Sequence, residues 1–190
     1  MTLALVLIVA YLLGSIPTSY IVVYRLTGRD IRTMGTGNPG TMNVVDTVGL
    51  RAGLVVGLGD ICKGMAAVGV AYLAGLSDRD AVLAGMCAVA GHDWSIFLRL
   101  DGGNGMAAAV GALIALLPEA ALIAVPAAIG LYVLGISRRM AGIVGLLLLL
   151  ALAYTFNAPE VRLIGAVVLL TFTVIKIFRF EGFSPARPGR

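Results

Sequence analysis

Residues 1–24, MTLALVLIVAYLLGSIPTSYIVVY, form an apolar stretch without a single charged side chain. A transmembrane helix needs about 20 consecutive, mostly apolar residues to cross the hydrocarbon core of a bilayer. No basic segment precedes this stretch and no clear small-residue cleavage site ends it, so we expect a retained helix and not a removed signal peptide. Arg25, Arg29 and Arg32 follow directly, which predicts a cytoplasmic end here and an N-terminus outside the cell.

The remainder of the chain is also strongly apolar. Hydrophobic residues make up 59% and charged residues 13% of the 190 residues, and the mean hydropathy is +1.00. Soluble domains carry about 25% charged residues, so this chain has too few charges to cover a water-exposed surface. Because lipid tolerates apolar side chains, we expect an all-α integral membrane protein made of one polytopic domain, residues 1–190.

Further apolar stretches predict about seven transmembrane helices. The later spans are expected at about 52–75, 81–98, 106–136, 140–156 and 161–178. Residues 106–136 are too long for one span, so Pro118-Glu119 is expected to turn the chain into a hairpin whose first arm, 106–117, is short. This topology puts the C-terminus in the cytoplasm, and eleven of the 14 basic residues fall on the cytoplasmic side.

The basic excess does not indicate nucleic acid. The net charge is +4, but the basic residues are scattered between apolar runs, without a basic stripe or interleaved aromatic side chains. Cys62 and Cys87 lie in apolar segments, which is typical of small buried side chains. With one histidine and no cysteine cluster, we expect no metal and no cofactor, and no motif indicates an oligomeric state.

Two glycine-rich loops lie on the predicted cytoplasmic face. Residues 35–40 read Gly-Thr-Gly-Asn-Pro-Gly, with Arg32 beside them, and residues 101–105 read Asp-Gly-Gly-Asn-Gly before a predicted helix. Glycine lets the backbone approach an anion, and a helix N-terminus presents unpaired N–H groups. One such loop is weak evidence, because tight turns need glycine in any case. Two on one face, with basic side chains nearby, indicate a site for a small phosphorylated or acylated molecule.

Three of the ionisable side chains within the predicted spans are candidates for the site. Asp60 and Lys63 are three residues apart, which puts them on one helix face. Charges inside a membrane usually pair with each other or line a cavity, so this pair either neutralises itself or faces a polar pocket. His92 is the only histidine and precedes the second glycine-rich loop, so it is either a hydrogen-bonded packing residue or part of the site.

Five motifs follow one another along residues 14–105. They are Gly14-Ser-Ile-Pro17 with Tyr20, the run from Arg32 to Val44, Asp60-Ile-Cys-Lys63-Gly64, Gly91-His92 with Phe97-Leu98, and Gly102-Gly103-Asn104-Gly105. In order and spacing they resemble the motifs of the bacterial acyl-phosphate:glycerol-3-phosphate acyltransferase family (PlsY). The resemblance implies a seven-helix fold.

The resemblance also implies a reaction. In that family an acyl phosphate donates its fatty acyl group to the 1-hydroxyl of glycerol 3-phosphate, forming lysophosphatidate and inorganic phosphate for phospholipid synthesis. Neither a metal nor a cofactor takes part. Because the mixed anhydride is already activated, the protein need supply mainly orientation and charge stabilisation. The implied setting is the bacterial plasma membrane, with a multi-pass chain among membrane lipids and an active site that faces the cytoplasm.

The resemblance assigns roles to particular residues. The implied catalytic residues are Arg32, Lys63 and His92, with His92 positioning a hydroxyl or bracing the second loop. The implied substrate- and phosphate-binding residues are Gly35, Thr36, Gly37, Asn38, Asn43, Asp60, Gly102, Gly103, Asn104 and Gly105. In this scheme the first loop holds one phosphate, with the two asparagines orienting the substrate or the loop. The glycines of the second loop bring their backbone N–H groups to the other phosphate.

Three departures from the family pattern stand out, and one of them removes a positive charge. Asn104 stands where the family's GGKG motif has lysine, and the loss of such a charge-assisted contact costs about 1.5–3 kcal/mol. The hydroxyl-rich run after the fifth span and the family's HRENI-like C-terminal segment are also replaced. Arg138, Arg139 or Arg179 are the candidates to restore the charge.

Three functional classes therefore remain open. The first is an acyltransferase. The second is a family member that binds acyl or lipid phosphate without turnover. The third is a small transporter, although no paired internal repeat of the kind found in transporters is evident.

Overall fold

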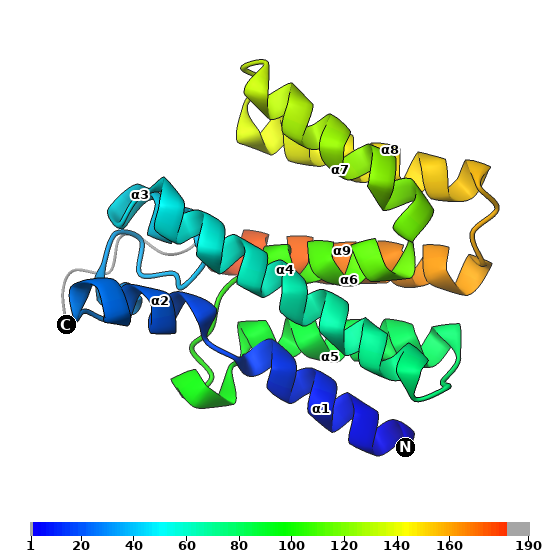
Figure 1. Cartoon of the computed structure of the whole chain (residues 1–190), viewed down its shortest axis with the longest axis horizontal. Coiled ribbons are helices and arrows are strands. Elements are labelled where there is room, and N and C mark those ends of the chain that lie inside the picture. The colour runs from blue at the N-terminus through cyan, green and yellow to red at the C-terminus, as the bar shows by residue number, and fades with distance from the viewer. Residues whose placement is uncertain (1, 182–190) are drawn as a thin grey trace.

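The computed structural model describes residues 2–181, except for the side chains of Arg138, Arg139 and residues 177–181. Every regular element in this range is helical, which confirms the all-α prediction (Figure 1). The α-helices are α1 (Leu3–Ser15), α2 (Thr18–Thr27), α3 (Thr41–Thr47), α4 (Leu50–Leu73), α5 (Asp78–Asp93), α6 (Met106–Leu116), α7 (Pro118–Val133), α8 (Arg138–Thr155) and α9 (Glu160–Glu181). Two short 3-10 helices, η1 (Ile31–Thr33) and η2 (Ile96–Leu98), lie in the loops.

The first predicted span is interrupted at Ile16–Pro17, between α1 and α2. Proline has no N–H for a helical hydrogen bond and disfavours helical geometry in the residue before it. Ile16 accordingly has φ −53° and ψ 117°, outside the helical region. Its carbonyl oxygen accepts hydrogen bonds from the Thr18 N–H at 3.0 Å and from Lys63 Nζ at 3.0 Å. The break therefore places a backbone acceptor inside the helix bundle.

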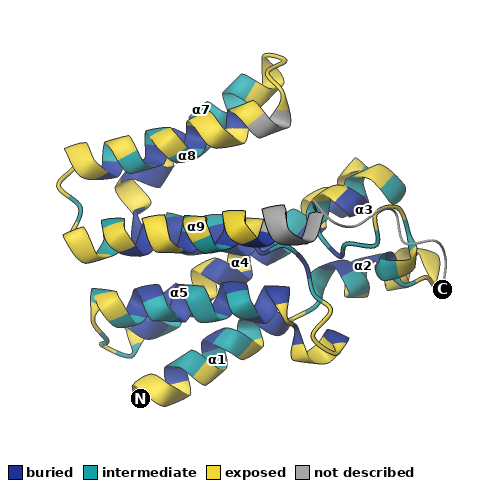
Figure 2. Cartoon of the chain, turned by 180° about the vertical axis from the view of Figure 1, so that it is seen from behind, coloured by how far each residue is buried: buried dark blue, intermediate teal, exposed yellow. Residues whose placement is uncertain are grey.

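Three helical segments among the described residues are long and apolar enough to cross a membrane: Leu3–Thr27, Leu50–Leu73 and Asp78–Leu98. Many large apolar side chains face outward, including those of Leu58 (61% exposed) and Leu122 (77% exposed). Figure 2 shows such exposed residues along α7 and α8, whereas α5 is largely buried. An apolar exterior of this kind suits lipid and not water.

The predicted turn at Pro118 is present. Leu117 separates α6 from α7 with φ −130° and ψ 56°, and Pro118 opens α7 at the first helical position, where a missing N–H is tolerated. Figure 1 shows α7 running back from the end of α6, as a helical hairpin requires. At 1.5 Å per residue, the 11 residues of α6 rise about 16 Å, roughly half of the hydrocarbon core. The first arm of the hairpin is therefore short, as expected.

Small residues bring α4 and α6 into close contact. A Cβ added to Gly64 of α4 would collide with the backbone of Ala108, and one added to Gly111 of α6 would collide with the backbone of Ile61. Such close approach between helices is typical of membrane proteins, in which packing and not water exclusion drives helix association. The tight contact fixes the part of α4 that carries Asp60 and Lys63.

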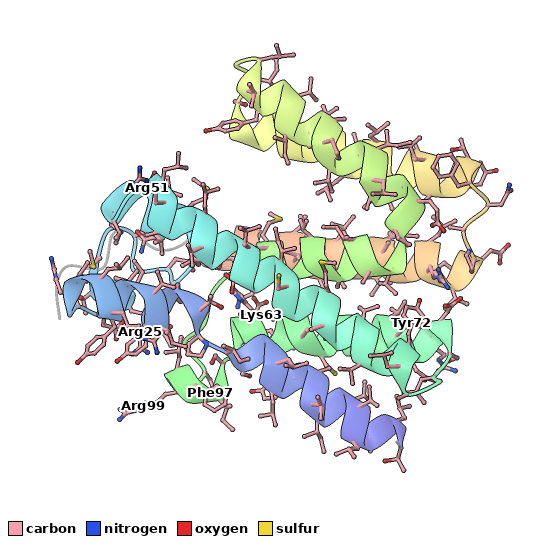
Figure 3. All side chains as sticks on the ribbon, in the orientation of Figure 1. Arg25, Arg51, Lys63, Tyr72, Phe97 and Arg99 are labelled. Carbon is pink, nitrogen blue, oxygen red and sulfur yellow. The ribbon has the colours of Figure 1, made fainter. Side chains whose placement is uncertain are left out.

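The two ends of the bundle differ in charge. Figure 3 shows Arg25, Arg51 and Arg99 at one end, near α2 and α3, and Tyr72 at the opposite end. We call these the basic end and the Tyr72 end. Both glycine-rich loops lie at the basic end, so the prediction that they share one face of the protein is confirmed.

A polar clasp joins three helices at the Tyr72 end. Arg162 Nη2 of α9 lies 2.8 Å from Asp78 Oδ1 at the start of α5. The Tyr72 hydroxyl of α4 donates to the same Asp78 oxygen at 3.0 Å, and the Arg162 guanidinium lies 5.4 Å from the centre of the Tyr72 ring. The charge of Arg162 is thus balanced by a carboxylate.

Candidate active site

A buried cluster of charged side chains lies where the break between α1 and α2 meets α4 and α5. Lys63 Nζ lies 2.9 Å from Asp60 Oδ1 and donates to the Ile16 carbonyl at 3.0 Å. The same Asp60 oxygen accepts a hydrogen bond from Thr18 Oγ1 at 2.9 Å and lies 3.6 Å from His92 Nδ1. Asp60 and Lys63 therefore pair with each other, which is one of the two alternatives left open by their spacing, and they also line a small gap.

His92 links this cluster to the second glycine-rich loop. It lies in the last turn of α5, and its side chain is buried. Its backbone carbonyl accepts a hydrogen bond from the Gly103 N–H at 3.0 Å. Its ring packs so closely on the loop that a Cβ added to Gly103 would collide with Nε2. The imidazole is thus held between Asp60 and the loop backbone.

Two N–H groups of the second glycine-rich loop are bonded within the protein. Gly102 donates to the Asp93 carbonyl at 3.2 Å, and Gly103 donates to the His92 carbonyl at 3.0 Å. We expected these groups to face a phosphate, and in this conformation they do not. The reason is that the last carbonyls of α5 have no partner within their helix, and the loop folds back to supply one.

Asn43 organises the first glycine-rich loop. Its side-chain oxygen accepts a hydrogen bond from the Thr36 N–H at 3.0 Å, and its Nδ2 donates to the Asn38 carbonyl at 2.9 Å. Gly35 and Gly37 have φ values of +53° and +75°, which side chains other than glycine rarely adopt. Of the two roles expected for Asn43, the structure shows that of orienting the loop.

Arg32 joins the two loops. Its Nη2 lies 2.7 Å from Asp30 Oδ2, and its Nη1 donates to the Leu98 carbonyl at 3.2 Å and lies 3.8 Å from Asp101 Oδ2. The hydrogen bonds from Arg32 lower the pKa of Asp30, and the Asp30 carboxylate raises the pKa of Arg32. The guanidinium therefore stays charged and is held at the boundary between the loops.

Two cavities adjoin at the basic end. The larger, of about 420 Å³, is lined by Pro17, Tyr20, Ile21, Arg32, Phe97 and Leu98. Its volume is within the range of small-molecule sites. The smaller, of about 10 Å³, lies against the charged cluster and has room for no more than a water molecule. Pro17 and Leu98 line both cavities and separate the charged cluster from the larger one.

Lys176 of α9 is a part of the site that sequence reasoning missed. Its Nζ donates to the Gly103 carbonyl at 2.7 Å and lies 3.3 Å from Asp93 Oδ1. It also lies 4.7 Å from the centre of the Trp94 ring. The available signal was a lysine near the end of an apolar span, because charges at membrane depth usually have a partner and a function.

The positive charge expected from Arg138, Arg139 or Arg179 falls on side chains outside the described part of the chain. Lys176 is a cation that is hydrogen-bonded to the backbone of the second glycine-rich loop, which has Asn104 in place of a lysine.

Comparisons with known proteins agree with this arrangement. The family model for glycerol-3-phosphate acyltransferase matches residues 4–182. The chain belongs to the glycerol-3-phosphate acyltransferase family. The matched range includes both glycine-rich loops, the Asp60–Lys63 pair and Lys176, so the elements of the site all lie within the region that defines the family.

Curated members of the family match to different extents. The glycerol-3-phosphate acyltransferase of Clostridioides difficile (strain 630) is 48% identical over 119 residues, which are 60% of this chain and 58% of that protein. The chain thus spans little more than half the length of this relative, and the same holds for glycerol-3-phosphate acyltransferase 1 of Dehalococcoides mccartyi, with 49% identity and 54% of that protein covered. The glycerol-3-phosphate acyltransferase of Pseudomonas fluorescens (strain Pf-5) is 37% identical over 179 residues, 94% of this chain and 92% of that protein.

Two solved structures share the fold. Both are crystal structures of PlsY (YgiH), described as an integral membrane glycerol 3-phosphate acyltransferase, in a glycerol 3-phosphate form and a lysophosphatidic acid form. Each has a TM-score of 0.81 to this chain, with 25% and 26% identity. The matches cover 99% and 96% of this chain and 96% and 91% of theirs. The chain is therefore an all-helical integral membrane protein.

Proposed function

We propose that the protein transfers a fatty acyl group from an acyl phosphate to the 1-hydroxyl of glycerol 3-phosphate, forming lysophosphatidate and inorganic phosphate. The observation that carries the proposal is the buried Lys63–Asp60–His92 cluster, which adjoins both glycine-rich loops in a member of this family. The names of the relatives support the acceptor, and the lysophosphatidic acid form of the solved structure supports the product.

The proposed reaction needs no group beyond the two substrates and the protein. The acceptor oxygen forms an ester bond with the acyl carbon, and the bond from that carbon to the phosphate oxygen breaks. The phosphate leaves with the bonding electrons, and the proton lost by the hydroxyl ends on the phosphate. Because the anhydride is already activated, the contribution of the protein is to align the two substrates and to balance charge that develops on the phosphate.

The geometry supports distinct roles for the three catalytic candidates. Lys63 supplies positive charge from α4, and Asp60 holds both that ammonium and the imidazole of His92. In our proposal the imidazole accepts the proton of the reacting hydroxyl or orients it, which requires the 102–105 loop to move away from Nε2 when the substrates bind. Arg32 lines the larger cavity, where its guanidinium binds the phosphate of an entering substrate.

Substrate binding must also open the site. Because the gap beside the charged cluster has a volume of only about 10 Å³, neither substrate fits there in the present conformation. In our proposal the substrates enter through the cavity at Arg32, and the segments around Pro17 and Leu98 move apart. The loop residues Gly35, Thr36, Gly37 and Asn38 then hold one phosphate. Gly102, Gly103, Asn104 and Gly105 hold the other, which requires the loop to release the carbonyls of α5.

We further propose the membrane topology. In this topology the chain is one domain, residues 1–190, and crosses the bacterial plasma membrane seven times, with α1 and α2 together forming the first crossing. The N-terminus is outside, the C-terminus is cytoplasmic and the active site faces the cytoplasm. The arginines at the basic end support this orientation, because basic residues accumulate on the cytoplasmic side (Figure 3).

Cysteine labelling tests the topology. In a background without Cys62 and Cys87, Ser77→Cys is expected to react with a membrane-impermeant maleimide in intact cells. Leu100→Cys is expected to react only after the membrane is opened. Both positions are exposed, so accessibility of the side chain itself does not limit either reaction. The reverse pattern would invert the proposed orientation.

The activity is tested by release of inorganic phosphate from palmitoyl phosphate by the purified protein, with and without glycerol 3-phosphate. Arg32→Ala is expected to lower acceptor-dependent release about 10- to 150-fold, the equivalent of a charge-assisted hydrogen bond of about 1.5–3 kcal/mol. Arg25→Ala, which removes an exposed arginine at the same end, serves as the matched control and is expected to retain activity. Binding of palmitoyl phosphate without any acceptor-dependent release would refute the transferase and favour a binding-only protein.

A further inference from the structure

Gly103 is held from two sides by different helices. Its N–H donates to the His92 carbonyl of α5 at 3.0 Å, and its carbonyl accepts from Lys176 Nζ of α9 at 2.7 Å. Gly103 also lines the small polar gap that Lys63 and His92 line. The orientation of the Gly103–Asn104 peptide relative to the charged cluster therefore depends on where Lys176 lies, because a trans peptide unit moves as one plane.

The surroundings of Lys176 supply partners for a buried ammonium. Its side chain is 9% exposed, and burying a charge is unfavourable unless partners replace the lost water. The Gly103 carbonyl, the Asp93 carboxylate at 3.3 Å and the face of Trp94 at 4.7 Å act as these partners. The ammonium of Lys176 is thus hydrogen-bonded directly to the backbone of the second glycine-rich loop.

We propose that Lys176 is a positioning residue of the acyl-transfer site. Its ammonium holds the Gly103 carbonyl and thereby supplies, from α9, the positive charge that the 102–105 loop does not carry in its own sequence. The inference rests on the proposed function and deepens it. In the family's GGKG motif the lysine at the position of Asn104 supplies this charge, whereas here we assign it to the last helix.

The competing explanation is that Lys176 only neutralises Asp93. Neither Asp93 carboxylate oxygen has a hydrogen-bond donor among the described residues, and Lys176 Nζ lies within ion-pair distance of one of them. Lys176→Met alone does not separate the two explanations, because it leaves a buried carboxylate without its cation and is expected to lower the yield of folded protein.

Four variants separate them. Lys176→Arg keeps a cation, and Asp93→Asn with Lys176→Met removes both charges of the pair. Asn104→Lys added to Asp93→Asn/Lys176→Met returns a cation to the loop without leaving Asp93 as an unpaired carboxylate. Val174→Met, at an exposed position of α9, is the matched control for a methionine in this helix.

The turnover measurement is kcat and KM for glycerol 3-phosphate with palmitoyl phosphate as donor. For Asp93→Asn/Lys176→Met we expect a folded protein whose kcat is at least tenfold below that of wild type. We expect Lys176→Arg and the triple variant Asp93→Asn/Asn104→Lys/Lys176→Met to have at least a third of the wild-type kcat, and Val174→Met to match wild type. A wild-type kcat in Asp93→Asn/Lys176→Met would overturn the proposal, because charge balance alone would then explain Lys176.

Amide hydrogen exchange of residues 102–105 tests the same contact without turnover. Exchange in folded Asp93→Asn/Lys176→Met is expected to be at least tenfold faster than in wild type, because Gly103 loses one of its two supports. Equal exchange rates would overturn the proposal. If wild type shows no turnover at all, the proposed function fails, and the exchange result still decides whether Lys176 holds the loop.

Discussion

Replacing Lys63 by Met is expected to destabilise the protein strongly, because Asp60 becomes a buried carboxylate without its cation. The Asp60 side chain is 1% exposed, and Lys63 Nζ lies 2.9 Å from Oδ1. Removing one partner of a buried ion pair costs about 3–5 kcal/mol, since the remaining charge stays desolvated. Thr18 keeps its 2.9 Å hydrogen bond to the carboxylate, so we expect a loss near the lower limit, about 3 kcal/mol in the free energy of unfolding.

The matched control is Asp60→Asn with Lys63→Met, which removes both charges and keeps an acceptor for Thr18. Replacing a whole buried pair by neutral groups is often close to neutral, so the double variant is expected within about 1 kcal/mol of wild type. The assay is unfolding in mixed micelles of increasing SDS content, followed by the emission of Trp94, the only tryptophan. A single variant as stable as wild type, or a double variant as unstable as the single one, would refute the reasoning.

Activity separates the stabilising role of Lys63 from its proposed catalytic role. In the phosphate-release assay the rate of acceptor-dependent release is expected to fall at least tenfold in both variants, because neither has the ammonium on α4. A double variant that regains both stability and activity would show that Lys63 serves only to balance Asp60.

Three further outcomes follow from the loops. Gly103→Ala is expected to lower kcat at least tenfold, because its Cβ collides with the imidazole of His92. The control Gly130→Ala, with open space around it, is expected to leave kcat unchanged. Equal kcat values for the two variants would contradict the close packing of Gly103 on His92. Asn43→Ala removes the bonds that shape the first loop and is expected to cost about 1–3 kcal/mol in thermal unfolding and to raise KM; an unchanged melting temperature would speak against it. Arg32 lowers the pKa of Asp30, so their contact stabilises the fold above the ordinary pKa of 3.8 and this stabilisation is lost as the pH falls through the lower pKa of the folded state. Asp30→Asn is therefore expected to make the free energy of unfolding less dependent on pH in that acid range. A pH dependence equal to that of wild type would argue that the contact does not form.

Much of the fold was predictable because the membrane restricts the possibilities. A backbone in lipid must satisfy its hydrogen bonds internally, so apolar stretches of sufficient length predict helices directly. Pro118 turned the chain where expected, and the i, i+3 spacing of Asp60 and Lys63 correctly placed them on one face. These features depend on neighbouring residues, and sequence reasoning handles local relations well.

The parts that sequence reasoning missed depend on contacts between distant segments. Lys176 and Gly103 are 73 positions apart, and no local pattern joins them. The N–H groups of Gly102 and Gly103 suggested an anion site, but their use depends on how the loop meets the end of α5. A glycine-rich sequence predicts that the backbone can come close to a partner, but it does not predict which partner that is.

The clasp at the Tyr72 end gives α9 a second point of attachment. Arg162 is tied to Asp78 there, and Lys176 is tied to Gly103 at the basic end. Lys176 follows Arg162 by 14 positions, which corresponds to about 21 Å of helix, so α9 is held at two points along its length. A bilayer that is thinner than the hydrophobic length of a helix tilts that helix. Tilting α9 strains its contact with Asp78 or its contact with Gly103, so the thickness of the surrounding lipid affects the geometry of the site.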